Sequence, residues 1–213
     1  MLASLDHKYV LLMNPKTGST SFNKTLRNYA NIKVGGSAKF KHISYVEYRE
    51  IFGDFFYRNG CDVFIVVREP LEVLKSWYRF RYDLKRYSEL EMKRRTKAKK
   101  PKDKSDKTTV GMTFQEFMGE WSKPEQIPVA KIDCGINFCL DIRGNIPSDI
   151  TFIRYEELQK LADILSEKTG RKLVIPKLNV SPPIPDELLR LDNEEIYLKL
   201  AKAREIYVRI PFA

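Results

Sequence analysis

The chain has 213 residues and a formal net charge of +10, with 43% hydrophobic and 31% charged residues. This composition is typical of a globular domain, and we expect a single domain over residues 1–213. The apolar run at residues 9–13 is too short for a membrane span or a signal peptide, which disfavours a secreted or membrane-anchored protein. A cytoplasmic protein is therefore expected, although a fragment trimmed of its anchor would look the same.

Apolar runs alternate with segments of helical periodicity, which predicts an α/β domain with a mostly parallel central sheet flanked by helices. Ser44 and Glu47 form a capping box, Pro70 occupies a favoured first helical position, and Gly170 ends a later helix. The predicted elements are strands at 8–13, 61–67 and 151–154, a loop or short strand at 33–41, and helices at 19–29, 44–52, 70–82, 156–169 and 193–207.

A basic segment interrupts this pattern. Residues 93–107 hold nine Lys or Arg and two Asp, and so contribute +7 of the net +10. Because the segment offers nothing apolar to pack, we expect a mobile surface insertion at about 83–108. Its charge favours an anionic partner.

The cysteines predict neither disulfides nor a metal site. Cys61, Cys134 and Cys139 are odd in number, lack a Cys-x-x-Cys pair and follow no secretory signal. The histidines, His7 and His42, are too few to complete a zinc site. Core or surface thiols and no bound metal are therefore expected.

A loop suited to an anion connects the first predicted strand and helix, with the sequence Met-Asn-Pro-Lys-Thr-Gly-Ser-Thr-Ser-Phe at 13–22. N–H groups at the start of the helix can donate to a phosphate or sulfate. Gly18 permits close backbone approach, and Lys16 adds a compact charge. The hydroxyl donors are Thr17, Ser19, Thr20 and Ser21. An ordinary strand–helix turn is the alternative, since the lysine precedes the glycine and the loop is not a Walker A motif.

A second candidate anion site follows the strand at 61–67. Arg68 falls at the carboxyl end of this strand, where open α/β sheets bind ligands, and a guanidinium suits a phosphate. Ser76, eight residues later, could share an anion with Arg68. Taken singly, Arg68 is explained equally well by a structural ion pair, and Ser76 by a solvated helix serine.

Together the two elements resemble those of sulfotransferases that use 3′-phosphoadenosine 5′-phosphosulfate (PAPS). The resemblance implies a P-loop-like, three-layer fold, with the loop at 16–21 on the 5′-phosphosulfate and with Arg68 and Ser76 on the 3′-phosphate. It extends to the segments at 152–158 and 178–181. Carbohydrate sulfotransferases of the uronyl and heparan sulfate 2-O type are the subgroup that the chain resembles most, through this loop and the His-x-Ser-Tyr segment at 42–45. The chain departs from them in its shortness, its lack of a membrane anchor and its basic insertion.

The resemblance implies transfer of a sulfuryl group from PAPS to the hydroxyl of a glycan or other acceptor, with 3′-phosphoadenosine 5′-phosphate (PAP) as product. Lys16 is the candidate for stabilising the leaving phosphate, and His42 is the candidate general base because its ordinary pKa is near 6.5. Glu47 and Glu50 are reserve bases, and His7 receives no role. No metal is required, because a sulfuryl group carries less charge than a phosphoryl group.

Three other hypotheses stay open. A P-loop nucleotide kinase would need a Walker lysine and a carboxylate for magnesium, and the residue order in the loop argues against it. A nucleic-acid-binding module would fit the net charge, but no helix-turn-helix, zinc finger or RNA-binding aromatic signature accompanies it, and no nucleic-acid partner is expected. An inactive relative that only binds PAP is the third, although the main functional positions are filled.

Overall fold

The computed structural model describes residues 1–35, 41–82, 108–178, 181 and 183–213. The predicted basic insertion at 83–108 thus lies outside the described residues, apart from Thr108. By their contacts the residues divide into two compact units, one of 1–70, 135–179 and 204–213 and the other of 71–134 and 180–203. One domain over the whole chain stays a prediction. No helix in the described ranges is both long and apolar enough to cross a membrane.

The first unit is built on a five-stranded sheet in the order β3-β1-β2-β4-β5. The strands are β1 (Leu2–Ser4), β2 (Tyr9–Leu12), β3 (Ile32–Lys33), β4 (Asp62–Val67) and β5 (Thr151–Arg154). The neighbours β2, β4 and β5 are parallel, whereas β1 pairs antiparallel with β2 and with β3. The α/β class is confirmed, but the sheet is mixed rather than mostly parallel. The chain reverses within residues 5–8, and so short a connection joins only antiparallel strands.

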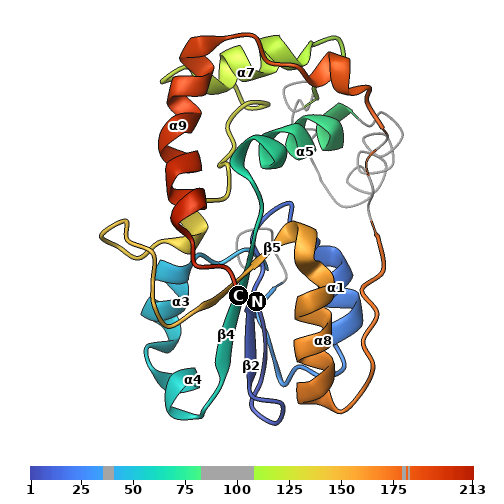
Figure 1. The fold of residues 1–213 in the computed structure, drawn as a ribbon, viewed down its shortest axis with the longest axis vertical. Helices are drawn as coiled ribbons and strands as arrows, with labels where there is room; N and C mark the ends of the chain where they lie inside the picture. Colours follow the sequence, from blue (N-terminus) through green and yellow to red (C-terminus); the bar gives the residue numbers. More distant parts are fainter. Residues whose placement is uncertain (36–40, 83–107, 179–180, 182) are drawn as a thin grey trace, which may run out of the picture. The chain divides into compact units, whose positions relative to one another are not determined.

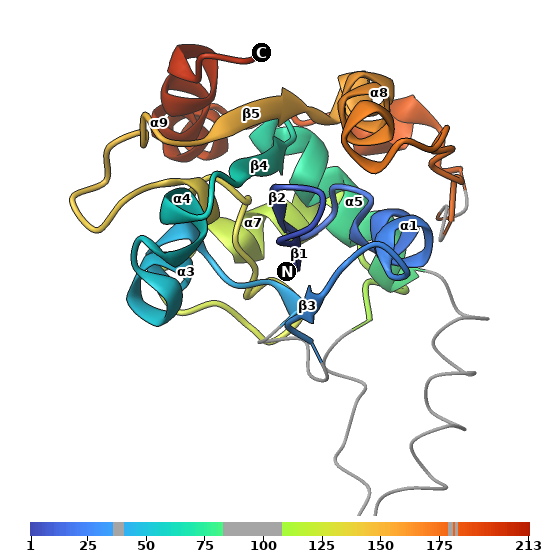
Figure 2. The same cartoon turned by 90° about the horizontal axis from the view of Figure 1, so that it is seen from below.

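Helices cover both faces of this sheet (Figures 1 and 2). On one face lie α1 (Ser19–Leu26) and α8 (Leu158–Thr169), and on the other lie α3 (Tyr45–Phe52) and α4 (Phe55–Arg58). A buried cluster joins α1 and α8 to the sheet through Phe22, Leu26, Leu161, Leu165 and Leu11. This packing fixes the start of α1, and with it the loop that follows β2.

The second unit is helical. It contains α5 (Pro70–Tyr82) from its second residue onward, α7 (Phe114–Ser122), a short 3₁₀ helix (Asp186–Leu189) and the first part of α9 (Glu194–Arg209). Tyr78 packs against Phe114 and Phe117, with ring centroids 5.4 and 5.6 Å apart, and its hydroxyl donates to the Met112 carbonyl at 2.6 Å. An aromatic core therefore holds α5 against α7.

Most predicted elements are confirmed, some with corrected ends. The helix at 70–82 has the predicted bounds, and the Ser44–Glu47 capping box is present ahead of α3. The first helix ends at Leu26, not at 29, and α8 begins at Leu158 after a 3₁₀ turn over Tyr155–Glu157. Gly170, with a φ of +63°, ends α8 as predicted. The sequence predictions missed β1, α4 and α7.

Candidate functional site

Three segments that carry candidate residues meet at one edge of the sheet. The anion loop (residues 13–21) follows β2, Arg68 follows β4, and Tyr155 follows β5. The strands are parallel and in register, with Leu12 opposite Ile65 in β2 and β4 and Val67 opposite Arg154 in β4 and β5. Because parallel strands end on the same side, the three segments share the carboxyl edge at which open α/β sheets bind ligands.

The backbone of the anion loop leaves the first N–H groups of α1 without partners inside the helix. Gly18, the N-cap of α1, has a φ of +78° and makes no side-chain capping bond, and Lys16 is also left-handed with a φ of +63°. The first N–H groups to bond within the helix are those of Ser21 and Phe22, which donate to the Gly18 carbonyl at 2.9 and 3.2 Å. The N–H groups of the preceding residues therefore lie at the positive end of the helix, where they suit an anion.

Side chains of the protein brace this loop. Thr17, which is 2% exposed, donates its hydroxyl proton to the Asn14 carbonyl at 2.7 Å. The Asn14 amide donates in turn to the Gly135 carbonyl at 3.0 Å. At the other end, Ser21 Oγ accepts the Leu178 N–H at 3.3 Å. The hydroxyl of Thr17 thus supports the loop, and its predicted contact with the anion stays a prediction.

His42 lies against the first residue of the loop. Its Nδ1 is 2.6 Å from the Met13 carbonyl oxygen. A carbonyl only accepts, so Nδ1 carries the proton and the neutral ring has its lone pair on Nε2. Burial lowers the pKa of His42 below 6.5, the charges of Lys41 and Lys16 lower it further, and the bond to Met13 opposes them. His42 is therefore held as a neutral base beside the loop.

Tyr155 connects Arg68 with the loop. The guanidinium carbon of Arg68 lies 4.3 Å from the centroid of the Tyr155 ring. A Cβ atom added to Gly18 would lie 4.0 Å from Tyr155 Cε2 and 3.5 Å from Leu158 Cδ1. The two predicted anion-binding elements are thus neighbours of one aromatic ring, and the segment at 152–158 supplies it.

The other candidate residues lie on other elements. Ser76 is on α5 in the second unit, and its pairing with Arg68 stays a prediction. Glu47 accepts the Ser44 N–H at 2.7 Å in the capping box, and Glu50 is exposed. His7 Nδ1 contacts the Lys168 carbonyl at 3.1 Å. Among the candidate bases, His42 is the one in contact with the loop.

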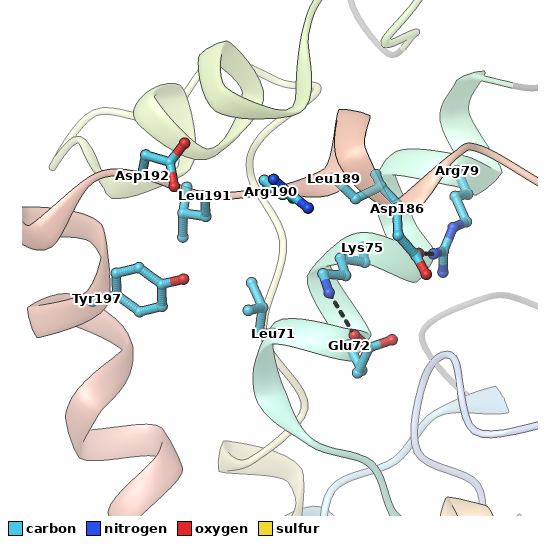
Figure 3. A pocket seen from close by; sticks show the side chains of 10 residues that line it. All are labelled: Leu71, Glu72, Lys75, Arg79, Asp186, Leu189, Arg190, Leu191, Asp192 and Tyr197. Carbon is cyan, nitrogen blue, oxygen red and sulfur yellow. Dashed lines mark hydrogen bonds and ion pairs between the residues drawn. The ribbon is translucent and has the colours of Figure 1, made fainter.

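The second unit contains a separate pocket of about 520 Å³ between the start of α5 and residues 186–197 (Figure 3). Its lining pairs Lys75 with Glu72 at 2.8 Å and Arg79 with Asp186 at 3.6 Å. In all, the charged side chains that line it are Lys75, Arg79, Arg190, Glu72, Asp186 and Asp192. Cations and carboxylates are equal in number, so the pocket offers no net charge to an anion, unlike the loop.

Sequence reasoning overlooked three residues of this site. Lys41 donates to Thr20 Oγ1 at 3.4 Å, Tyr155 stacks with Arg68, and Asn14 is 2% exposed with no hydrogen-bond partner for its Oδ1 among the described residues. Two of them are sequence neighbours of residues in the motifs, because Lys41 precedes His42 and Asn14 precedes the proline of the loop. This position in the sequence was the signal that could have indicated them.

The first unit is thus an α/β unit with a basic, braced loop at the carboxyl edge of its parallel strands and a neutral histidine beside that loop. Comparison of the chain with protein-family models and with curated proteins finds no match.

Proposed function

We propose that this protein is a sulfotransferase with a P-loop-like fold that moves a sulfuryl group from PAPS to an acceptor hydroxyl. The observation that carries the proposal is the 2.6 Å contact between His42 Nδ1 and the Met13 carbonyl, which brings a neutral base to the anion loop. The sequence resemblance is independent support, because it assigned the loop and His42 to this chemistry from residue types alone.

The residues present fit the anionic groups of PAPS. The open start of α1 and Lys16 suit the 5′-phosphosulfate, and Arg68, held over Tyr155 at the same sheet edge, suits a second phosphate. When bound, PAPS supplies an activated sulfuryl group. A glycan or other hydroxyl compound is proposed as acceptor, and an anionic one fits the net charge of +10.

His42 would take the proton of the acceptor hydroxyl on Nε2. The acceptor oxygen then forms a bond to sulfur while the bond from sulfur to the bridging phosphate oxygen breaks, and the electron pair of the broken bond stays on the phosphate. Lys16 and the N–H groups of the loop stabilise the charge that develops there. These roles are those of in-line group transfer, in which positioning and charge stabilisation dominate catalysis.

A donor-dependent transfer assay tests the proposal. The protein is incubated with PAPS and a panel of charged and neutral glycans, small alcohols and peptides, and products are detected by mass. A parallel series contains ATP and Mg²⁺, because sulfated and phosphorylated products have nearly the same mass and the donor must distinguish them. We expect products with PAPS alone. Transfer from ATP and none from PAPS would instead identify a kinase.

A further inference from the structure

The segment that carries His42 also holds a second cation against the anion loop. Lys41 Nζ donates to Thr20 Oγ1 at 3.4 Å, while the ring of His42 contacts the Met13 carbonyl at 2.6 Å. Met13 precedes the loop lysine and Thr20 follows the loop glycine. Two consecutive residues therefore contact both ends of the loop.

The ammonium group of Lys41 is only partly solvated and has no counter-charge within the described residues. The side chain is half-buried, and burial lowers the pKa of Lys41. Among the parts of the chain that the structure describes, no ion pair involves it. Partial burial makes the charged form of a lysine less favourable, and a nearby negative charge favours it again. Its hydroxyl partner on Thr20 is neutral, so among the described residues an anionic ligand would meet no competing carboxylate at this ammonium group.

The position of Lys41 at the loop determines which part of a bound PAPS its ammonium group would contact. In an in-line transfer, the sulfuryl group stands between the phosphate, which the loop holds, and the acceptor oxygen, which His42 deprotonates. Lys41 is adjacent to His42 in the chain, and its ammonium group contacts Thr20 at the α1 end of the loop, so the same short segment brings a cation and the candidate base to the loop. We infer that Lys41 is a catalytic residue whose ammonium group binds an oxygen of the transferred sulfuryl group, an inference that rests on the proposed sulfotransferase function.

Binding measurements test this contact without an acceptor, because PAPS carries the sulfuryl group and PAP lacks it. We expect Lys41→Met to weaken PAPS binding by about 10- to 100-fold, as for a lost charge-assisted hydrogen bond, and to leave PAP binding within about twofold. Lys41→Arg should keep most of the PAPS affinity. The matched control is Lys24→Met, which removes an exposed lysine from the last turn of α1, and it should change neither affinity.

The same variants are then compared in turnover with any acceptor that the transfer assay identifies. The kcat of Lys41→Met should fall by about 10- to 100-fold, with the arginine variant between it and the wild type. Equal loss of PAP and PAPS affinity would show that Lys41 contacts the phosphate and not the sulfuryl group. Wild-type affinities and turnover in Lys41→Met would show that Lys41 contacts neither. Either result overturns the inference. A wild-type protein that binds neither PAP nor PAPS overturns the proposed function itself. Thermal melting of each variant checks that it is folded.

Discussion

Two substitutions at His42 separate its proposed role as base from its contact with the loop. His42→Ala removes both the Nε2 lone pair and the Nδ1 donor that bonds the Met13 carbonyl at 2.6 Å. His42→Asn removes only the base, because its amide nitrogen occupies nearly the position of Nδ1 and can donate to the same carbonyl. The two variants should therefore lose activity alike and differ in stability.

The size of each effect follows from the interaction that is lost. Loss of a general base lowers kcat by on the order of 10²–10⁴-fold. Met13 is 2% exposed, and a buried carbonyl left without its donor costs about 1–3 kcal/mol. The alanine variant should lose about that much stability in urea denaturation, and the asparagine variant should lose much less.

The pH dependence of kcat/KM provides the decisive assay, because it reports the pKa of the base in the free enzyme. A histidine of pKa 6.5 is roughly three-quarters neutral at pH 7, and burial, reinforced by Lys41 and Lys16, lowers the pKa of His42 below that value. The active form is the neutral one, so the wild-type rate should be near its plateau at pH 7 and fall as pH drops through an inflection below 6.5. Both variants should lack this inflection. Near-normal turnover of His42→Asn, or a wild-type inflection above 6.5, would refute the reasoning.

The remaining predictions concern the ligand, the loop and the insertion. Saturating PAP in metal-free buffer should raise the melting temperature. Arg68→Ala should weaken PAP binding in calorimetry, whereas Arg27→Ala, at an exposed arginine after α1, should not. Gly18→Ala should lower stability by about 1–2 kcal/mol, because a residue with a Cβ atom is strained in the left-handed region; Gly119→Ala, at a glycine with negative φ and open space, is the denaturation control. Replacing the lysines of 93–107 with glutamine should raise KM for an anionic acceptor and flatten its salt dependence, with kcat mostly kept.

Each of these predictions has an opposite outcome. An unchanged melting temperature at saturating PAP would contradict the proposed co-substrate. Normal PAP affinity in Arg68→Ala would show that the 3′-phosphate does not bind at the end of β4. Equal stability of the Gly18→Ala and Gly119→Ala variants would show that the left-handed backbone is not required. An unchanged KM after lysine replacement would limit the basic segment to a solubilising role.

The sequence predicted those helices whose first residues are specified by neighbouring residues in the chain. The Ser44–Glu47 capping box and Pro70 specify helix starts through neighbouring residues, and both were found in the sequence. The same kind of signal was overlooked at Thr113 and Glu116, a second capping box that begins α7. In contrast, β1 is three residues long and is held by pairing with β2 and β3, so no periodicity within it reveals a strand.

The candidate site was predictable in its parts and less so in its contacts. Parallel strands bring the loop and Arg68 to one sheet edge, which follows from the alternation of strands and helices. The Tyr155 ring beside Arg68 and the Lys41 contact with Thr20 depend on how separate segments pack. The tautomer of His42 likewise depends on a carbonyl 29 residues earlier in the chain, which spacing alone does not indicate.

The bracing of the anion loop bears on how fast and how selectively it binds. Bonds from Thr17 to Asn14, from Asn14 to Gly135 and from His42 to Met13 hold its backbone with the protein's own groups. Such a preorganised site loses little conformational entropy when a ligand arrives, so association should occur in one step, without a slow rearrangement. Rigidity also means that the loop cannot reshape itself around a ligand, so an anion whose oxygens do not meet its N–H groups should bind weakly.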